Sequence, residues 1–399
     1  MLFPCLAVLA AAAPAPLNLP ADTSVFAAGQ DTVAQNTAGR VEVEFARALK
    51  KKNVSLVDLA SLFPPPPPAP SEEGDKLFAD GREAYDNLDF DAATKALTGA
   101  AVFFIKRPTA AKAEQLAEIF LFLGASELQN GAKAAAQKEF TRALQMNPAL
   151  APDSKYFGAD VQGAFSAAQK EMGKRARGVL TVESVPAGAE VEAFGLGYGL
   201  TPVAEIELPA GRYMVRLTRP GFAPAAAFPE VVAGQTTDVR QQLEAVPALL
   251  DVRQKAEKLI TKQNFGTSAL PPGAVDVART MKGRFLVMLA VTSDAKLQPK
   301  VELQVWNANT GDRLTGVKFD ADAAGLDTAA EAVQAWVSRP GPTLATAHPA
   351  VQPSDGEPVF RKWWFWTAVG VVAAGGVTAG VVAAQPRNSG GFNVVLGQP

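Results

Sequence analysis

The chain has 399 residues, with 38 basic and 40 acidic side chains and a formal net charge of −2 at pH 7. This balance, without a basic stripe, excludes nucleic acid as an expected partner. One histidine, His348, and one cysteine, Cys5, leave no material for a Ser/His/Asp triad, a Cys/His pair or a zinc site built from these residues.

The remaining chemistry is that of paired carboxylates, which can hydrolyse glycosides or hold magnesium. Asp86, Asp89 and Asp91 are close in sequence, but they fall in a helical pattern, where a solvated face explains them. We therefore predict a non-enzymatic protein with no catalytic residues, no metal and no cofactor.

The chain begins with an apolar run, Met1–Ala13, that ends in small residues. This composition is typical of a secretory signal, and we assign residues 1–15 as a signal-like segment. The pattern is incomplete, because no Lys or Arg precedes the run, and Pro14 and Pro16 disfavour cleavage directly before them. Export is the resulting prediction.

Residues 16–63 are predicted to form a small α/β segment. Apolar residues at helical spacing indicate an amphipathic helix over Arg40–Lys50, and Val54–Leu59 fits either a short strand or a helix start. A Pro-rich linker, 64–71, follows. Its run Pro64–Pro68 favours an extended polyproline II spacer, although such runs also bind aromatic grooves.

Residues 72–175 are helical by pattern. Between Ala117 and Leu150, small and aromatic residues fall on a fixed spacing: Phe120, Leu123, Gly124, Ala136, Phe140, Ala143 and Pro148. This spacing resembles one tetratricopeptide repeat. The resemblance implies paired helices and a cap, here the predicted helix Asp160–Gly173. It implies either a groove that binds partner proteins or a scaffold that positions neighbouring domains.

Residues 178–244 carry turn and strand landmarks in a fixed order. Apolar residues alternate from Val179 to Val182, and a Pro-x-Gly-Ala turn begins at Pro186. The later landmarks are Thr201-Pro202, Leu208–Leu217, Pro220–Phe222 and Val231–Leu243. Alternation punctuated by Pro and Gly predicts a small antiparallel β-sandwich. The order resembles a PEGA domain, which implies an extracytoplasmic binding or spacer module without known chemistry.

Two aromatic residues in the glycine-rich stretch 193–200, Phe194 and Tyr198, are the predicted ligand or partner contacts. The stretch departs from the short polar turn usual in the PEGA family, and we interpret it as a hairpin tip. Its glycines lack the Lys-Ser/Thr ending and the following helix of a phosphate-binding loop. Packing in the core is the competing explanation for both rings.

Residues 245–340 are predicted to form an α+β domain. Its expected elements are a helix at Leu249–Lys262, a strand at Arg284–Val291, a hairpin at Lys300–Phe319 and a helix at Thr328–Val337. Their order weakly resembles the C-terminal half of envelope domains similar to the TolB or CsgG N-terminal regions. That resemblance implies a first half formed by residues 25–59, with the helical and PEGA-like modules inserted into one split domain.

An uncharged run of 22 residues, from Trp363 to Ala384, follows a linker at 341–361. As a helix it would extend about 33 Å, which matches a bilayer core. Tryptophans gather at one end of the run, as they do at membrane interfaces. We predict one transmembrane helix at 362–384, rather than a buried Ala/Gly-rich core helix, and a tail at 385–399.

Within this run, Gly376 and Gly380 form a G-x-x-x-G pair, which predicts helix–helix packing and a homodimer through the transmembrane helix. The signal-like start predicts that the domains lie in the periplasm. Arg361 and Lys362 on one side of the run, against Arg387 on the other, favour a tail-anchored protein with cytoplasmic domains instead.

The predicted fold class is multidomain α+β: tetratricopeptide-like helical hairpins, a PEGA-like β-sandwich, an α+β domain and one C-terminal transmembrane helix. The predicted function is a bacterial inner-membrane scaffold, single-pass with most of the chain in the periplasm, that binds envelope proteins. The alternative function is binding of a cell-wall glycan or another surface ligand through the PEGA-like domain.

Overall fold

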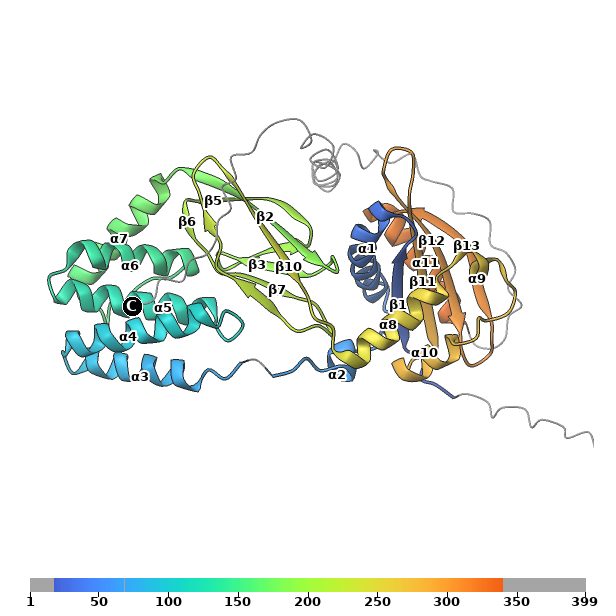
Figure 1. Ribbon diagram of the computed structural model, residues 1–399, viewed down its shortest axis with the longest axis horizontal. Coiled ribbons are helices and arrows are strands. Elements are labelled where there is room, and N and C mark those ends of the chain that lie inside the picture. The colour runs from blue at the N-terminus through green and yellow to red at the C-terminus, as the bar shows by residue number, and fades with distance from the viewer. Residues whose placement is uncertain (1–17, 68, 340–399) are drawn as a thin grey trace, which may run out of the picture. The chain divides into compact units, whose positions relative to one another are not determined.

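The computed structural model describes residues 18–67 and 69–339 (Figure 1). These residues form a mixed α/β arrangement with several small sheets. Residues 23–62 and 247–337 together build an α/β unit. Between them in sequence come a helical array, within residues 72–174, and a β unit, within residues 177–247.

The α/β unit has a four-stranded sheet in the order β1-β11-β12-β13. The strands are β1 (Thr23–Gly29), β11 (Phe285–Ser293), β12 (Pro299–Asn307) and β13 (Arg313–Asp320). β1 pairs in parallel with β11, from Thr23 opposite Phe285 to Gly29 opposite Val291, and the other neighbours are antiparallel. Segments from the two ends of the described chain therefore share one sheet.

Helices cover both faces of this sheet. They are α1 (Thr32–Lys51), α2 (Leu59–Leu62), α8 (Pro247–Leu259), α9 (Lys262–Gly266), α10 (Ala274–Met281) and α11 (Ala323–Val337). Alternate residues of β11 face opposite sides, so Val287 belongs to the core with α1 and α11, while Met288 belongs to the core with α8 and α10. Burial on both faces explains why β11 is apolar along most of its length.

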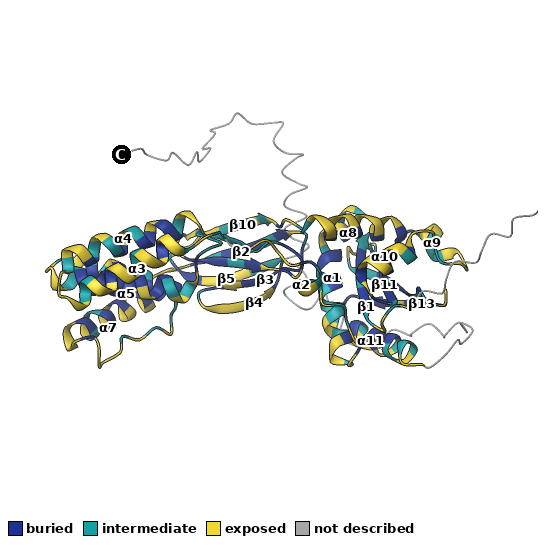
Figure 2. Cartoon of the chain, turned by 90° about the horizontal axis from the view of Figure 1, so that it is seen from below, coloured by how far each residue is buried: buried dark blue, intermediate teal, exposed yellow. Residues whose placement is uncertain are grey.

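The helical array consists of helices that pack in consecutive pairs. They are α3 (Glu72–Asp86), α4 (Phe90–Lys106), α5 (Ala113–Gln129), α6 (Lys133–Met146) and α7 (Ala159–Lys174). α5 is buried on all sides from Ile119 to Ser126, whereas the outer helices α3 and α7 are mostly exposed (Figure 2). Gly124 lies where α5 and α6 meet, and an added Cβ there would come within 2.7 Å of Phe140. The tetratricopeptide resemblance itself stays a prediction.

The β unit has two main sheets, in the orders β10-β2-β5 and β4-β3-β7-β8, and a small β6-β9 pair. The strands of the first sheet are β2 (Arg177–Val185), β5 (Val203–Pro209) and β10 (Thr236–Gln242). Those of the second are β3 (Glu190–Ala193), β4 (Leu196–Leu200), β7 (Val215–Thr218) and β8 (Ala225–Ala227). The small pair is β6 (Gly211–Arg212) and β9 (Glu230–Val231).

The prediction of a purely antiparallel sandwich is wrong at one strand pair. β2 and β10 run parallel, from Val179 opposite Thr236 to Val185 opposite Gln242. Alternation of apolar residues shows which face of a strand is buried but not the direction of its partner. Here the chain passes through the second sheet before β10 returns beside β2, and such a crossover connection produces a parallel pair.

The predicted fold class is also corrected at its transmembrane element. Across residues 18–67 and 69–339, no helix combines the length and the apolar character needed to cross a membrane. Several predictions lie outside the described residues: 1–15, 341–361, 362–384 with Gly376 and Gly380, and 385–399.

Candidate functional site

Three buried charged side chains meet where the β unit contacts the α/β unit. Glu42 comes from α1, Arg253 from α8, and Arg219 directly follows β7. Arg253 donates from Nη1 and Nη2 to the two carboxylate oxygens of Glu42, each at 2.8 Å. Arg219 donates from Nη2 to Glu42 Oε1 at 2.9 Å, and the backbone N–H of Ala27 donates to Oε2 at 3.0 Å. One carboxylate therefore links three elements and two guanidinium groups.

Burial makes these charges interdependent. The side chains of Arg219, Glu42 and Arg253 are only 2%, 7% and 11% exposed. Burial acts to raise the pKa of Glu42, but the charges of Arg253 and Arg219 outweigh it and hold that pKa below its ordinary value. Burial lowers the pKa of Arg219 to about 10, against the opposing charge of Glu42. At neutral pH all three groups are charged, and the cluster carries more positive than negative charge.

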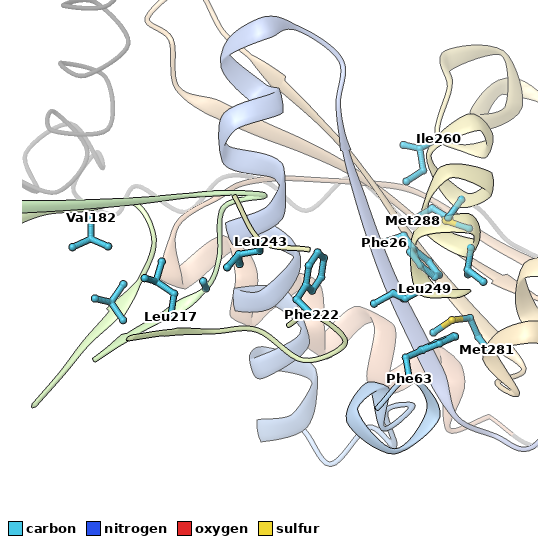
Figure 3. Close-up of a cluster of buried hydrophobic side chains, with 14 of the residues drawn as sticks. Phe26, Phe63, Val182, Leu217, Phe222, Leu243, Leu249, Ile260, Met281 and Met288 are labelled. Carbon is cyan, nitrogen blue, oxygen red and sulfur yellow. The ribbon is translucent and has the colours of Figure 1, made fainter. Parts of the chain in front are cut away.

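An aromatic ring and a turn complete the cluster. The guanidinium carbons of Arg219 and Arg253 lie 5.0 and 5.7 Å from the centroid of the Phe222 ring, within the range of cation–π attraction. Arg219 Nη1 also donates to the backbone oxygen of Ala187, in the Pro-x-Gly-Ala turn, at 2.5 Å. Figure 3 shows Phe222 in the same buried hydrophobic cluster as Phe26 of β1. Apolar packing thus surrounds the ion cluster.

A cavity of about 300 Å³ lies beside the Glu42 cluster and next to β1, the edge strand of its sheet. Thr23, Ser24, Arg219 and Arg253 are among the residues that line it. Thr23 and Ser24 are 1% and 3% exposed, and within the described residues their hydroxyl oxygens have no hydrogen-bond partner. Buried hydroxyls without partners are uncommon, because leaving them unpaired costs free energy.

The arrangement provides the features of a binding site: cations, hydroxyl donors and apolar walls. In the part of the chain that the structure describes, no three His, Cys, Asp or Glu side chains gather so that they could hold a metal ion. Beside the apolar walls, Arg219 and Arg253 provide positive charge that could recognise an anionic or polar group.

The structure places the two predicted contact residues, Phe194 and Tyr198, against the core of the β unit. Phe194 is half-buried at a backbone φ of 52°, and its ring meets that of Tyr213 edge-on with centroids 5.4 Å apart. Tyr198 is also half-buried, and burial raises the pKa of its hydroxyl. Neither lines the cavity at the Glu42 cluster. Their role as contacts stays a prediction.

Sequence reasoning missed the Glu42 cluster, although one signal was present. Glu42 lies on the same helical face as Ala38, Phe45 and Leu49, all of them buried. An acidic residue within an apolar stripe indicates a buried partner of opposite charge. Its partner Arg219 is 177 residues away along the chain, so no local pattern identifies it.

Comparison with known families gives one match. A family model of the PEGA domain matches residues 177–247, which confirms the resemblance found at 178–244. Arg219, Phe222 and the Pro186 turn all fall within the match, which assigns this part of the chain to a class of binding or interaction domain. No curated protein and no solved structure matches the chain.

Proposed function

We propose that this protein is a non-enzymatic interaction scaffold in which the β unit, matched as a PEGA domain, connects the α/β unit to the helical array. The observation that carries the proposal is the Glu42 cluster, because a buried carboxylate shared by Arg219 and Arg253 fixes the β unit against α1 and α8. Buried ion pairs require well-defined geometry, so they specify one arrangement of the groups that they join.

Contacts at the helical array support the same role. Met214 of the β unit belongs to the apolar core of the array and is buried. Phe194 packs partly against that core as well. Arg216 Nη1 donates to the backbone oxygen of Ala111 at 3.4 Å. A domain that uses side chains to contact both neighbours is suited to connect them.

The helical array offers a surface on which partner proteins could be bound. Tyr156 is 41% exposed, and its ring stacks on Tyr85 at a centroid distance of 6.1 Å. Exposed aromatic rings are enriched at protein interfaces. We propose partner proteins as the binding class, with proteins of a bacterial envelope among them.

The test uses Gly39, which lies in α1 against the Pro-x-Gly-Ala turn. A Cβ at Gly39 would lie 2.4 Å from the backbone oxygen of Ala187, so Gly39→Ala forces α1 and the turn apart while favouring the helix itself. Gly163→Ala in α7 is the matched control, because no heavy atom lies within 4 Å of its added Cβ.

For the test, a photocrosslinking amino acid replaces Tyr156 in the full chain, and each variant is expressed in cells. We expect the wild type and Gly163→Ala to crosslink to the same partner proteins, and Gly39→Ala to give a several-fold lower yield. Equal yields from Gly39→Ala and Gly163→Ala would contradict the connecting role of the β unit. No crosslinked protein from the wild type would contradict an interaction scaffold.

A further inference from the structure

We propose that the cavity beside the Glu42 cluster binds a small carboxylate with an apolar body. The site is separate from any protein-binding surface on the helical array, and it goes beyond the scaffold role. Three properties of the cavity carry the inference: its charge, its unpaired hydroxyls and its apolar walls.

Charge indicates that the ligand is an anion. The charged residues that line the cavity are Arg47, Lys50, Arg219 and Arg253, against Glu42 and Glu190. Glu190 is already paired with Arg47, with 2.5 Å between its Oε1 and Nη2, and Glu42 is shared by two arginines. Cations therefore outnumber carboxylates around a largely apolar space. Arg47, Lys50 and Glu190 are exposed, so the buried excess comes from Arg219 and Arg253 against Glu42. That excess of one positive charge is unfavourable, and a bound anion would offset it.

Two hydroxyl groups provide donors for the ligand's oxygens. Thr23 and Ser24 are adjacent in β1, so their side chains leave the strand on opposite faces. The cavity is lined from both sides of this edge strand, by Val43 and Ala46 of α1 and by Leu249 of α8. Each hydroxyl lacks a partner among the described residues but is covered by neighbouring atoms, so its side chain must rotate toward the cavity before it can donate to a carboxylate.

Apolar walls set the size and character of the rest of the ligand. Val25, Phe26, Leu56, Leu249 and Met281 line the cavity with hydrocarbon surface. A volume of about 300 Å³ is at the lower end of the range for small-molecule sites. The body of the ligand is therefore a short chain or a single ring.

Octanoate and its methyl ester are the probes, titrated calorimetrically into the full chain. They share the apolar chain and differ in the negative charge. We expect one octanoate to bind per chain, and the ester to bind at least about 10-fold more weakly, which corresponds to about 1.4 kcal/mol. Equal affinities for octanoate and the ester, or no saturable binding of octanoate, would overturn the proposal.

Removing a hydroxyl should change the affinity for octanoate without lowering the stability of the unliganded protein. Thr23→Val keeps the side-chain shape, so the unliganded protein should melt at the same temperature or higher, while octanoate binds about 3- to 10-fold more weakly. Thr94→Val is the matched control, because Thr94 in α4 also has a buried hydroxyl without a partner but does not line the cavity. Its affinity for octanoate should equal that of the wild type.

Ser24→Ala provides an independent check of the same site, since it removes the second hydroxyl. We expect a loss of octanoate affinity similar to that of Thr23→Val. If Thr23→Val and Ser24→Ala both bind octanoate as the wild type does, the hydroxyls do not contact the ligand and the proposed site is wrong.

Discussion

The β unit contacts its two neighbours in different ways. Toward α1 and α8 it combines apolar packing through Phe222 with Arg219 in a buried ion cluster, whereas toward the helical array it uses Met214 in an apolar core. An ion cluster depends on the position and charge of each partner, while apolar packing depends mainly on buried area and tolerates changes of shape. The comparison indicates that the first contact fixes orientation and responds to pH, and that the second supplies attraction that is insensitive to pH.

The largest predicted change in stability is at the Glu42 cluster, where the β unit contacts α1 and α8. We call this the charged contact. Glu42→Gln leaves two buried guanidinium groups without a carboxylate and should lower the free energy of unfolding by about 3–5 kcal/mol. Denaturant titration followed by circular dichroism measures it. Glu302→Gln is the control, because Glu302 faces Lys318 at 3.6 Å at a more exposed position and should change stability by less than about 1 kcal/mol. Similar losses from both variants would contradict a special role for Glu42.

A smaller change in stability is expected where Met214 of the β unit packs against the helical array. We call this the apolar contact. Met214→Ala removes a buried side chain from the core of the array and should cost about 2–3 kcal/mol, whereas Met214→Leu should cost less than about 1.5 kcal/mol. The same titrations measure both variants. If Met214→Leu were as damaging as Met214→Ala, the contact would depend on shape as strictly as the charged contact does.

Acid should weaken only the charged contact. Because the pKa of Glu42 in the folded protein lies below its ordinary value of 4.5, its stabilisation is fully present above that value and is lost as pH falls through the folded pKa. We expect the stability difference between the wild type and Glu42→Gln to shrink as pH falls below 4.5. The difference between the wild type and Met214→Ala should stay constant over the same interval, and a parallel change in both would refute the distinction.

The smallest effect is predicted for Arg216→Ala. The hydrogen bond from Arg216 to the backbone oxygen of Ala111 is long, at 3.4 Å, and Arg216 is half-buried. Its loss should change the free energy of unfolding by about 0.5 kcal/mol. A loss above about 2 kcal/mol would show that the contact with the array is also held by polar interactions.

Sequence patterns predicted those elements whose signals, such as alternation and turn residues, come from neighbouring residues. Alternation and turn residues located the β unit, and Gly188 in its Pro-x-Gly-Ala turn adopts a φ of 91°, which favours glycine. The predicted helix at Asp160–Gly173 lies within α7, and the predicted hairpin at Lys300–Phe319 corresponds to β12 and β13. Each of these signals comes from residues that are neighbours in sequence.

Features that depend on distant partners were not predictable in this way. The helices α9 and α10 have only five and eight residues, too few to show a helical period clearly. The parallel pairing of β2 with β10 and the sharing of Glu42 by Arg219 and Arg253 are properties of tertiary structure. The transmembrane prediction came from the length, the lack of charge and the clustered tryptophans of the run at 363–384, which lies outside the described residues; among the described residues no helix could cross a membrane.

The parallel pairing of β1 with β11 also determines the order in which the chain can fold. Thr23 cannot meet Phe285 until the ribosome has produced nearly the whole described chain, whereas the helical array and the β unit can assemble earlier from their own residues. Closing so long a loop carries an entropic cost, which a compact insert reduces by holding its ends close together. We therefore expect the inserted units, once folded, to shorten the loop that must close before β1 pairs with β11.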